Sequence, residues 1–212
     1  MPDAKAWFVA RRWLQFEGEL RTNLLRIIAI CVFYLIHLAN YGSSQGWFAR
    51  LGLLQLEGNV DQAFHTAVTL LAVAWTMLAA GVHLALRNRL FPDWLPYATV
   101  ATDVLLLTCV LYLGDGAASA LCVGYFLAIA LAALRFHLPL IWLATAASAV
   151  GYVCLLGIAK WPDRFAGGRA LPQVPRYEQL TVLAALILTG VVLGQVVRRV
   201  RETFTRHFEA RE

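Results

Sequence analysis

The sequence predicts an all-α protein, a bundle of six transmembrane helices, and three observations lead to this prediction. Of its 212 residues, 60% are hydrophobic and only 15% are charged, whereas soluble domains carry roughly 25% charged residues. Apolar runs of about 18 residues recur along the chain, and each can cross a hydrocarbon core about 30 Å thick as a helix. Most basic residues flank these runs. The six predicted spans are Leu24–Tyr41, Ala63–Leu86, Tyr97–Leu113, Ala117–Leu134, Leu138–Ile158 and Leu180–Val197.

The segment before the first span is rich in aromatic and basic residues. Trp7, Phe8, Trp13, Leu14 and Phe16 lie among basic side chains in residues 1–23, a pattern suited to an amphipathic helix on the inner membrane surface. A flank that anchors the first span is the other interpretation. A removable signal peptide is not expected, because the first apolar run follows a polar segment without a small-residue cleavage site.

The connections between the middle spans predict sequential antiparallel neighbours. The stretch Arg87–Pro96 contains Pro92 and Pro96, which end one helix and begin the next. The turns at 114–116 (Gly-Asp-Gly) and 135–137 (Arg-Phe-His) are both short. Residues 160–177 hold several prolines and glycines without periodicity and are expected to form a loop.

The distribution of basic residues predicts that both termini lie in the cytoplasm. With this orientation, only five of the 18 lysines and arginines face outward, as the positive-inside bias favours. The five are Arg50, Lys160, Arg164, Arg169 and Arg176. The chain has a net charge of +5, and the lipid bilayer is the expected partner of its basic residues. Nucleic acid is not an expected partner.

The last span is expected to continue as a helix into the cytoplasm, because residues 198–208 contain neither glycine nor proline. Val197, Val200, Phe204 and His207 or Phe208 form an apolar seam suited to a partner helix, although a stop-transfer flank has a similar pattern. The chain therefore divides into an N-terminal segment (1–23), a transmembrane domain (24–197) and a cytoplasmic connecting helix (198–212).

Two glycines in the last span could form a helix–helix contact. Gly190 and Gly194 are spaced four residues apart, as in the small-xxx-small motif that lets helix backbones approach closely in lipid. This face predicts a homodimer through the sixth helix. The alternative is that the glycines seat the helix against its neighbours in the same bundle.

Asp103 is the clearest ionisable residue inside a predicted span, and such residues are costly in hydrocarbon and indicate function by default. Thr99 and Thr102 could hydrogen-bond to it, and Arg135 is the expected long-armed partner. A structural ion pair is the preferred interpretation, and a proton or ligand site is the alternative.

Four histidines fall at two predicted depths. His37 and His65 belong to the outer half of the bundle, and His83 and His137 to the inner half. Because residues 65 and 83 are separated by about 27 Å of helix, the histidines would form two sites. Paired imidazoles could hold non-covalent haem b, while His37, His65 and Glu178 would suit a transition metal. Hydrogen-bonded structural histidines are the third interpretation.

Motifs of conventional enzymes are not found. The sequence has no phosphate-binding glycine-rich loop, no His-Glu-x-x-His motif and no nucleophile elbow. The four cysteines fall inside predicted spans and are expected to pack as small apolar side chains. The chain is therefore not expected to be an enzyme by itself.

The layout resembles the membrane input domains of bacterial sensors, such as those that precede histidine kinases and class III adenylyl cyclases. The resemblance covers the six short spans, the aromatic and basic N-terminal segment and the exit of the last helix over Gly190–Phe208. It implies a receptor in the bacterial inner (plasma) membrane that passes a ligand or redox signal through the sixth helix. An output domain, which could be enzymatic, is expected to follow Glu212, since the last helix ends there without a cap. The alternative is a b-type, two-haem membrane cytochrome that transfers electrons.

Overall fold

All the regular secondary structure of the described residues is helical. The computed structural model describes residues 3–44, 61–88, 92–165 and 171–209, with side chains described for residues 16–43, 61–88, 92–164 and 171–203. Two 3₁₀ turns precede α5. The elements are α1 (Asp3–Ser44), α3 (Gln62–Arg87), α4 (Leu95–Leu113), η1 (Gly116–Ala118), η2 (Ala120–Cys122), α5 (Val123–Ala133), α6 (Leu138–Lys160), α7 (Pro162–Phe165) and α8 (Arg176–Glu209).

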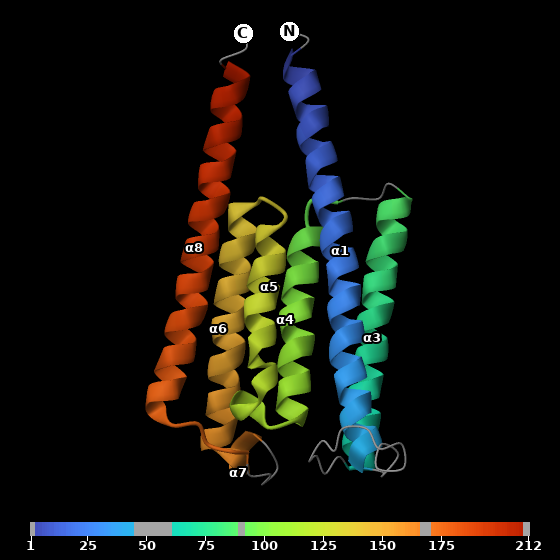
Figure 1. Cartoon of the computed structure of the whole chain (residues 1–212), viewed down its shortest axis with the longest axis vertical. Coiled ribbons are helices and arrows are strands. Elements are labelled where there is room, and N and C mark those ends of the chain that lie inside the picture. The colour runs from blue at the N-terminus through green and yellow to red at the C-terminus, as the bar shows by residue number, and fades with distance from the viewer. Residues whose placement is uncertain (1–2, 45–60, 89–91, 166–170, 210–212) are drawn as a thin grey trace.

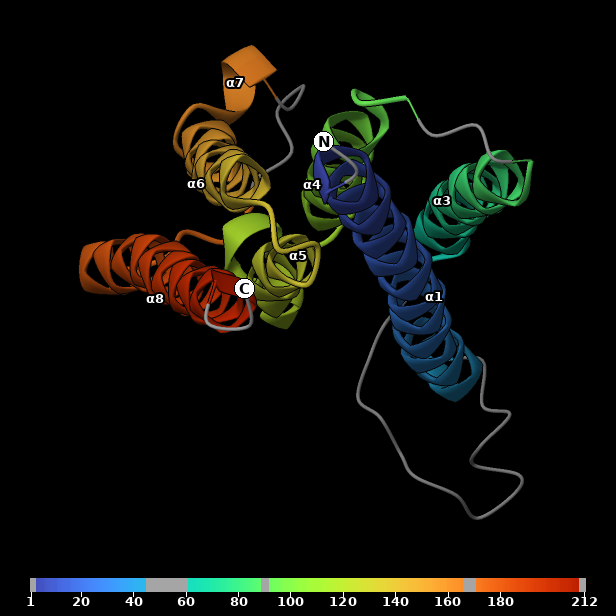
Figure 2. The same cartoon turned by 90° about the horizontal axis from the view of Figure 1, so that it is seen from above.

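The long helices run alternately up and down, so that both termini lie at the same end of the bundle (Figure 1). Viewed from above, α4, α5, α6 and α8 form one group, and α1 and α3 form a pair beside it (Figure 2). Helix α4 packs against α3 on one side and α6 on the other, and α8 packs on α5 and α6. Helix α4 therefore joins the pair to the group.

Among the described residues, five helices are long and apolar enough to cross a membrane, namely α1, α3, α4, α6 and α8. The fourth predicted span, Ala117–Leu134, differs from the prediction because its apolar helix covers only Ala120–Ala133, and the α-helical part begins at Val123. Gly116 has a φ of 61°, and Ser119 is extended and accepts a hydrogen bond from the Leu121 amide. Such hydrogen bonds between a side chain and the nearby backbone compete with the backbone hydrogen bonds of a regular helix. The chain therefore turns twice before α5 begins.

The first and last helices are continuous. Helix α1 runs from Asp3 to Ser44 without a break near residue 24, so the N-terminal segment is not a separate helix. Helix α8 continues beyond Val197 to Glu209, as the sequence predicts. In this part of α8, Val197 is buried and Val200 is half-buried. The rest of the predicted seam (Phe204, His207 and Phe208) and the aromatic side chains at 7, 8, 13 and 14 lie outside the described side chains.

The core lies between α4, α5, α6 and α8, where Tyr125, Ile141, Tyr152 and Leu186 are fully buried. Glycine lets α8 approach α6, since a Cβ at Gly190 would collide with the Thr145 side chain, and Gly194 faces Leu138 and Trp142. Both glycines are buried. The glycine face of α8 therefore lies against α6 of the same chain, as in the alternative interpretation, and a homodimer through α8 stays a prediction.

Candidate functional site

One face of α1 is polar and buried. Glu19, Thr22, Asn23 and Arg26 recur at the three- and four-residue spacing of one helix face, and none is more than 2% exposed. Leu20, Leu24 and Leu25 on the other side of the helix are exposed. The polar face of α1 thus points into the bundle and its apolar face points outward.

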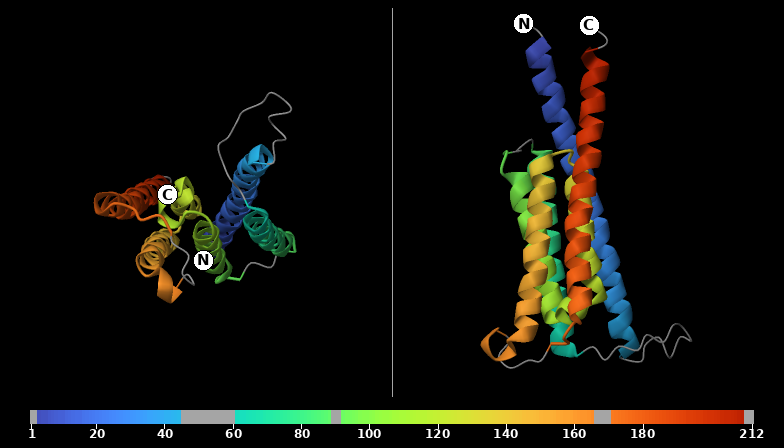
Figure 3. Two further views of the ribbon diagram at one scale, coloured as in Figure 1. Left: turned by 90° about the horizontal axis from the view of Figure 1, so that it is seen from below. Right: turned by 90° about the vertical axis from the view of Figure 1, so that its left-hand side faces the viewer.

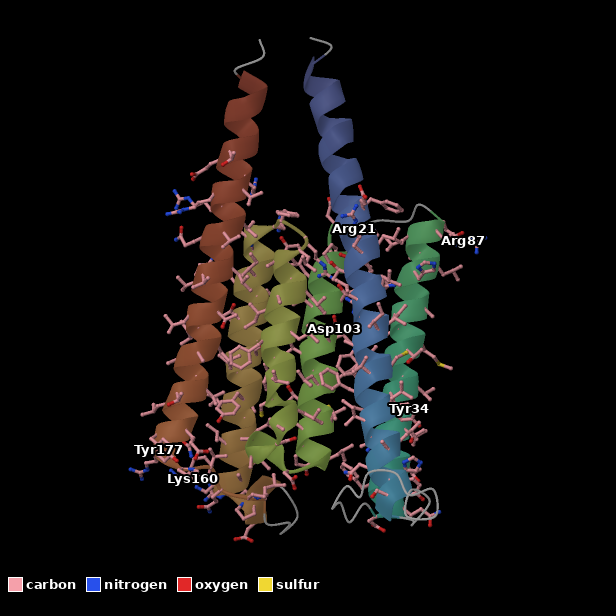
Figure 4. The ribbon with its side chains drawn as sticks, viewed as in Figure 1. Arg21, Tyr34, Arg87, Asp103, Lys160 and Tyr177 are labelled. Carbon is pink, nitrogen blue, oxygen red and sulfur yellow. The ribbon has the colours of Figure 1, made fainter. Side chains whose placement is uncertain are left out.

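Arg26 forms the first of two ion pairs at this face. Its Nε donates to Asp103 Oδ2 on α4 at 2.9 Å, and its Nη1 donates to Asn23 Oδ1 at 2.8 Å. Trp75 on α3 donates from Nε1 to Asp103 Oδ1 at 2.9 Å, and Asn23 donates to the Ala79 carbonyl at 3.0 Å. This ion pair therefore ties α1, α3 and α4 together; Figure 4 labels Asp103 on α4, beside α1.

Arg135, which follows α5, forms the second ion pair. Its Nη2 donates to Glu19 Oε1 at 2.8 Å and to Thr99 Oγ1 at 3.1 Å, and its Nη1 donates to the Pro96 carbonyl at 2.9 Å. Burial lowers the pKa of the Arg135 guanidinium from its ordinary value, while the Glu19 carboxylate opposes this effect. The second pair joins the end of α5 to α1 and α4. We call the two pairs with their neighbours the polar junction: Glu19, Asn23, Arg26, Trp75, Thr99, Asp103 and Arg135.

Asp103 and Arg135, which the sequence predicts to pair with each other, both belong to the polar junction, but each pairs with another residue. Asp103 pairs with Arg26 and not with Arg135, and Arg135 pairs with Glu19. Thr99 and Thr102 donate to backbone carbonyls and not to the Asp103 carboxylate. Sequence reasoning missed Glu19, Asn23 and Arg26 because they lie around the start of the first predicted span, where polar residues are typical of a cytoplasmic flank. Their helical spacing was the signal that could have found them.

The polar junction is balanced in charge but not in hydrogen bonds. It contains two cationic and two anionic side chains, each paired with one of opposite sign. Among the described side chains, Glu19 Oε2, Arg26 Nη2 and Arg135 Nε are buried without a hydrogen-bond partner. Buried polar atoms are rarely left unpaired, so each of these three atoms has capacity for one further hydrogen bond.

The outer pair of histidines comes together between α1 and α3. His37 Nε2 lies 3.1 Å from His65 Nδ1, and the rings are nearly parallel, with an interplanar angle of 13°. Tyr41 stacks on His65 with ring centroids 3.9 Å apart. Two axial ligands on opposite faces of one iron need about twice a metal–nitrogen bond, roughly 4 Å. The observed pair is a direct hydrogen bond, which is too close for that arrangement.

The other predicted ligands are not brought together. His83 is exposed on α3, whereas His137 lies beside Tyr97 at the start of α6, and the helices α1 and α4 lie between α3 and α6 (Figure 2). Glu178 accepts a hydrogen bond from Tyr177 at the start of α8, and Figure 4 shows Tyr177 across the bundle from Tyr34 of α1. Within the described residues, no three His, Cys, Asp or Glu side chains are placed to hold a metal ion. The structure therefore brings His37 and His65 together, but neither His83 with His137 nor Glu178 with the outer histidines, and haem or metal binding stays a prediction.

A cleft of about 1010 Å³ lies below the polar junction, between α1, α3, α4 and α5. One end is lined by Arg26, Trp75 and Asp103, and the opposite end by Asn40, Asp61 and Asp115. The walls between them are mostly apolar. The lining side chains come from residues 26–40 of α1, 61–75 at α3, 103–115 at α4, and 119–131 at η2 and α5.

The cleft is closed where α1 meets the end of α5. A Cβ on Gly18 would lie 3.6 Å from the Leu134 carbonyl oxygen, and Glu19 pairs with Arg135 just beyond. Further from the junction, the side chains of α1 and α5 line the same cleft. The arrangement can therefore take an elongated apolar ligand whose polar end meets Arg26 and Asp103.

Comparisons with known proteins do not identify the chain: no protein family, curated protein or solved structure matches it.

Proposed function

We propose that this chain is a membrane-embedded input domain of a receptor, and that α8 passes a change in the bundle to a domain or partner in the cytoplasm. The observation that carries the proposal is that α1 and α8 both extend past the other helices at the same end (Figure 3). Helix α8, with 34 residues, is about 51 Å long, whereas α4, with 19 residues, is about 28 Å long. A continuous helix of this length can transmit rotation or translation.

The distribution of apolar side chains supports a location in lipid. Large apolar side chains such as Leu70, Met77, Val150 and Leu188 are more than half exposed on the outside of the bundle. Charged side chains are buried inside, on the polar face of α1. Lipid favours apolar side chains outside and paired charges inside, whereas water favours a polar exterior. The bilayer is the solvent that this surface suits.

Two helices could relay a change from the cleft to the cytoplasmic end. Helix α5 lines the cleft on one side and packs against α8 on the other. Helix α1 lines the cleft and extends from the same end of the bundle as α8 (Figure 1). A ligand that parts α1 from α5 would therefore move the cytoplasmic ends of α1 and α8 relative to each other.

Helix phase provides the test. A reporter kinase or cyclase domain is fused after Glu212, and alanines are inserted after Thr203. Two inserted residues rotate the reporter by about 200°, whereas seven rotate it by about two full turns. We expect two alanines to change reporter output and seven to restore it. The same insertions before Asp3 serve as the control and should have no effect. Output that is independent of the inserted length would overturn the proposal.

The alternative of a b-type cytochrome stays a prediction, and it requires that the direct hydrogen bond between His37 and His65 open to admit an iron. A visible absorption spectrum of protein from haem-supplemented cells decides it, because bound haem gives a Soret band.

A further inference from the structure

We propose that the cleft between α1, α3, α4 and α5 binds a single-chain amphipath with an uncharged hydroxyl head, which hydrogen-bonds to Arg26 and Asp103. This inference rests on the proposed location of the chain in a bilayer and names the class of ligand that its receptor would recognise.

The shape of the cleft suits one extended alkyl chain. Arg26 and Asn40 mark its two ends on α1 and are separated by about 21 Å of helix. Small side chains widen the cleft along its length, since Ala29, Ala67, Ala72, Gly124 and Ala128 all line it. Between these positions lie large apolar side chains such as Phe33, Phe64 and Leu107. A cleft with small residues on facing helices and apolar walls admits a narrow hydrocarbon.

The closed end of the cleft offers one donor and one acceptor. Arg26 lines this end, is 2% exposed, and has Nη2 without a hydrogen-bond partner. Asp103 also lines it, with a side chain that is 13% exposed, so a carboxylate oxygen can accept one more bond. A hydroxyl both donates and accepts. A single hydroxyl can therefore bond to both residues, provided that the Arg26 side chain turns slightly toward the cleft.

The charge of the polar junction excludes an ionic head. Arg26 is neutralised by Asp103, and Arg135 by Glu19, so the junction carries no net charge. A carboxylate or an ammonium head would add an unpaired buried charge, which is costly away from water. An uncharged head avoids this cost and still supplies the missing partner of Arg26.

Photolabelling of the chain in lipid nanodiscs tests this inference. The probe is a long-chain primary alcohol that carries a diazirine in its chain, and the matched probes are the carboxylic acid and the hydrocarbon of equal length. We expect the alcohol to label α1 and α5 about tenfold more than either matched probe. Equal labelling by all three, which would show occupancy by any lipid, or preferred labelling by the acid overturns the inference.

A cleft-filling variant and its matched control locate the site. Ala67→Phe fills the cleft, while Ala74→Phe adds the same side chain on the exposed side of the same helix. We expect labelling by the alcohol to fall about tenfold in Ala67→Phe and to stay unchanged in Ala74→Phe. Equal labelling of the two variants would place the probe elsewhere and overturn the inference.

The head group is tested by changing the charge of the junction. Asp103→Asn leaves the junction with one net positive charge, so the carboxylic acid should now label better than the alcohol. A preference that stays with the alcohol would contradict the charge argument. If this variant does not fold, the comparison of the three probes on the unaltered chain still decides. Labelling is measured on the chain alone, and reporter output is measured on the fusion, so the two results are independent. If labelling shows no site but reporter output depends on helix phase, the proposed function stands and this inference fails. If labelling shows the site but reporter output is independent of helix phase, only the proposed function fails.

Discussion

Arg26 illustrates how a single side chain can organise a bundle. It contributes to the contact between α1, α3 and α4 through Asp103, to which Trp75 also donates, and through Asn23, which itself bonds to α3. The burial of this guanidinium requires that each neighbour keep its charge or its hydrogen bond. Loss of one partner leaves the other as an unpaired buried charge, whereas replacement of both partners by apolar residues leaves no buried charge.

This asymmetry predicts the effect of mutations in the first ion pair. Asp103→Ala should destabilise the protein by about 3–5 kcal/mol, whereas the double variant Arg26→Met with Asp103→Leu should cost much less. The measurement is the thermal unfolding of the purified protein in detergent.

The exposed pair of Arg21 and Glu17 provides the control for this prediction. Its side chains are 75% and 32% exposed, so Arg21→Ala should change stability by less than about 1 kcal/mol. A double variant as unstable as Asp103→Ala would show that the pair itself, and not the unpaired charge, determines the stability.

At the scale of helices, close contact between α6 and α8 depends on small residues. Gly190 of α8 lies against Thr145 of α6, where a Cβ would collide. The sequence pattern of Gly190 and Gly194 predicts a close contact between helices, and the structure contains such a contact. The sequence pattern alone could not show which helix makes the contact, because a helix of a partner subunit and a neighbouring helix of the same chain require the same small residues.

Substitution of these glycines separates the two arrangements. Gly190→Leu should prevent assembly of the bundle, with a loss of folded protein, because the new side chain would collide with the buried Thr145 side chain. Gly81→Leu on α3 is the control, since nothing lies within 4 Å of a Cβ at that position. Folded protein is measured by size-exclusion chromatography. A Gly190→Leu variant that folds but no longer crosslinks as a dimer would instead support an interface between subunits.

At the scale of the whole molecule, apolar runs predict most of the architecture. The helices α3, α4 and α6 begin and end within about two residues of the predicted spans, because runs of apolar residues and Pro or Gly punctuation are local signals. The shortened α5 was not predicted, since Ala117–Leu134 contains no charged residue and the turns before α5 depend on Gly116 and Ser119. The pairing of Asp103 with Arg26 was also missed. It depends on how α1 is rotated against α4, and this rotation is set by tertiary packing that hydropathy does not record.

The last prediction concerns the orientation of the bundle in the membrane. Both termini lie at one end (Figure 1), and that end carries Arg87 and the arginines at 198, 199 and 201, whereas Lys160 and Arg176 lie at the other. From the positive-inside bias we predict that the termini lie in the cytoplasm. Single cysteines at Asn88 and Glu209, in a variant without native cysteines, should therefore react only with membrane-permeant thiol reagents in intact cells. Cysteines at Gln45 and Gly168 should react with impermeant reagents as well. Labelling of Asn88 or Glu209 by an impermeant reagent would reverse the orientation and place the extended end of α8 outside the cell, where a cytoplasmic output domain could not follow it.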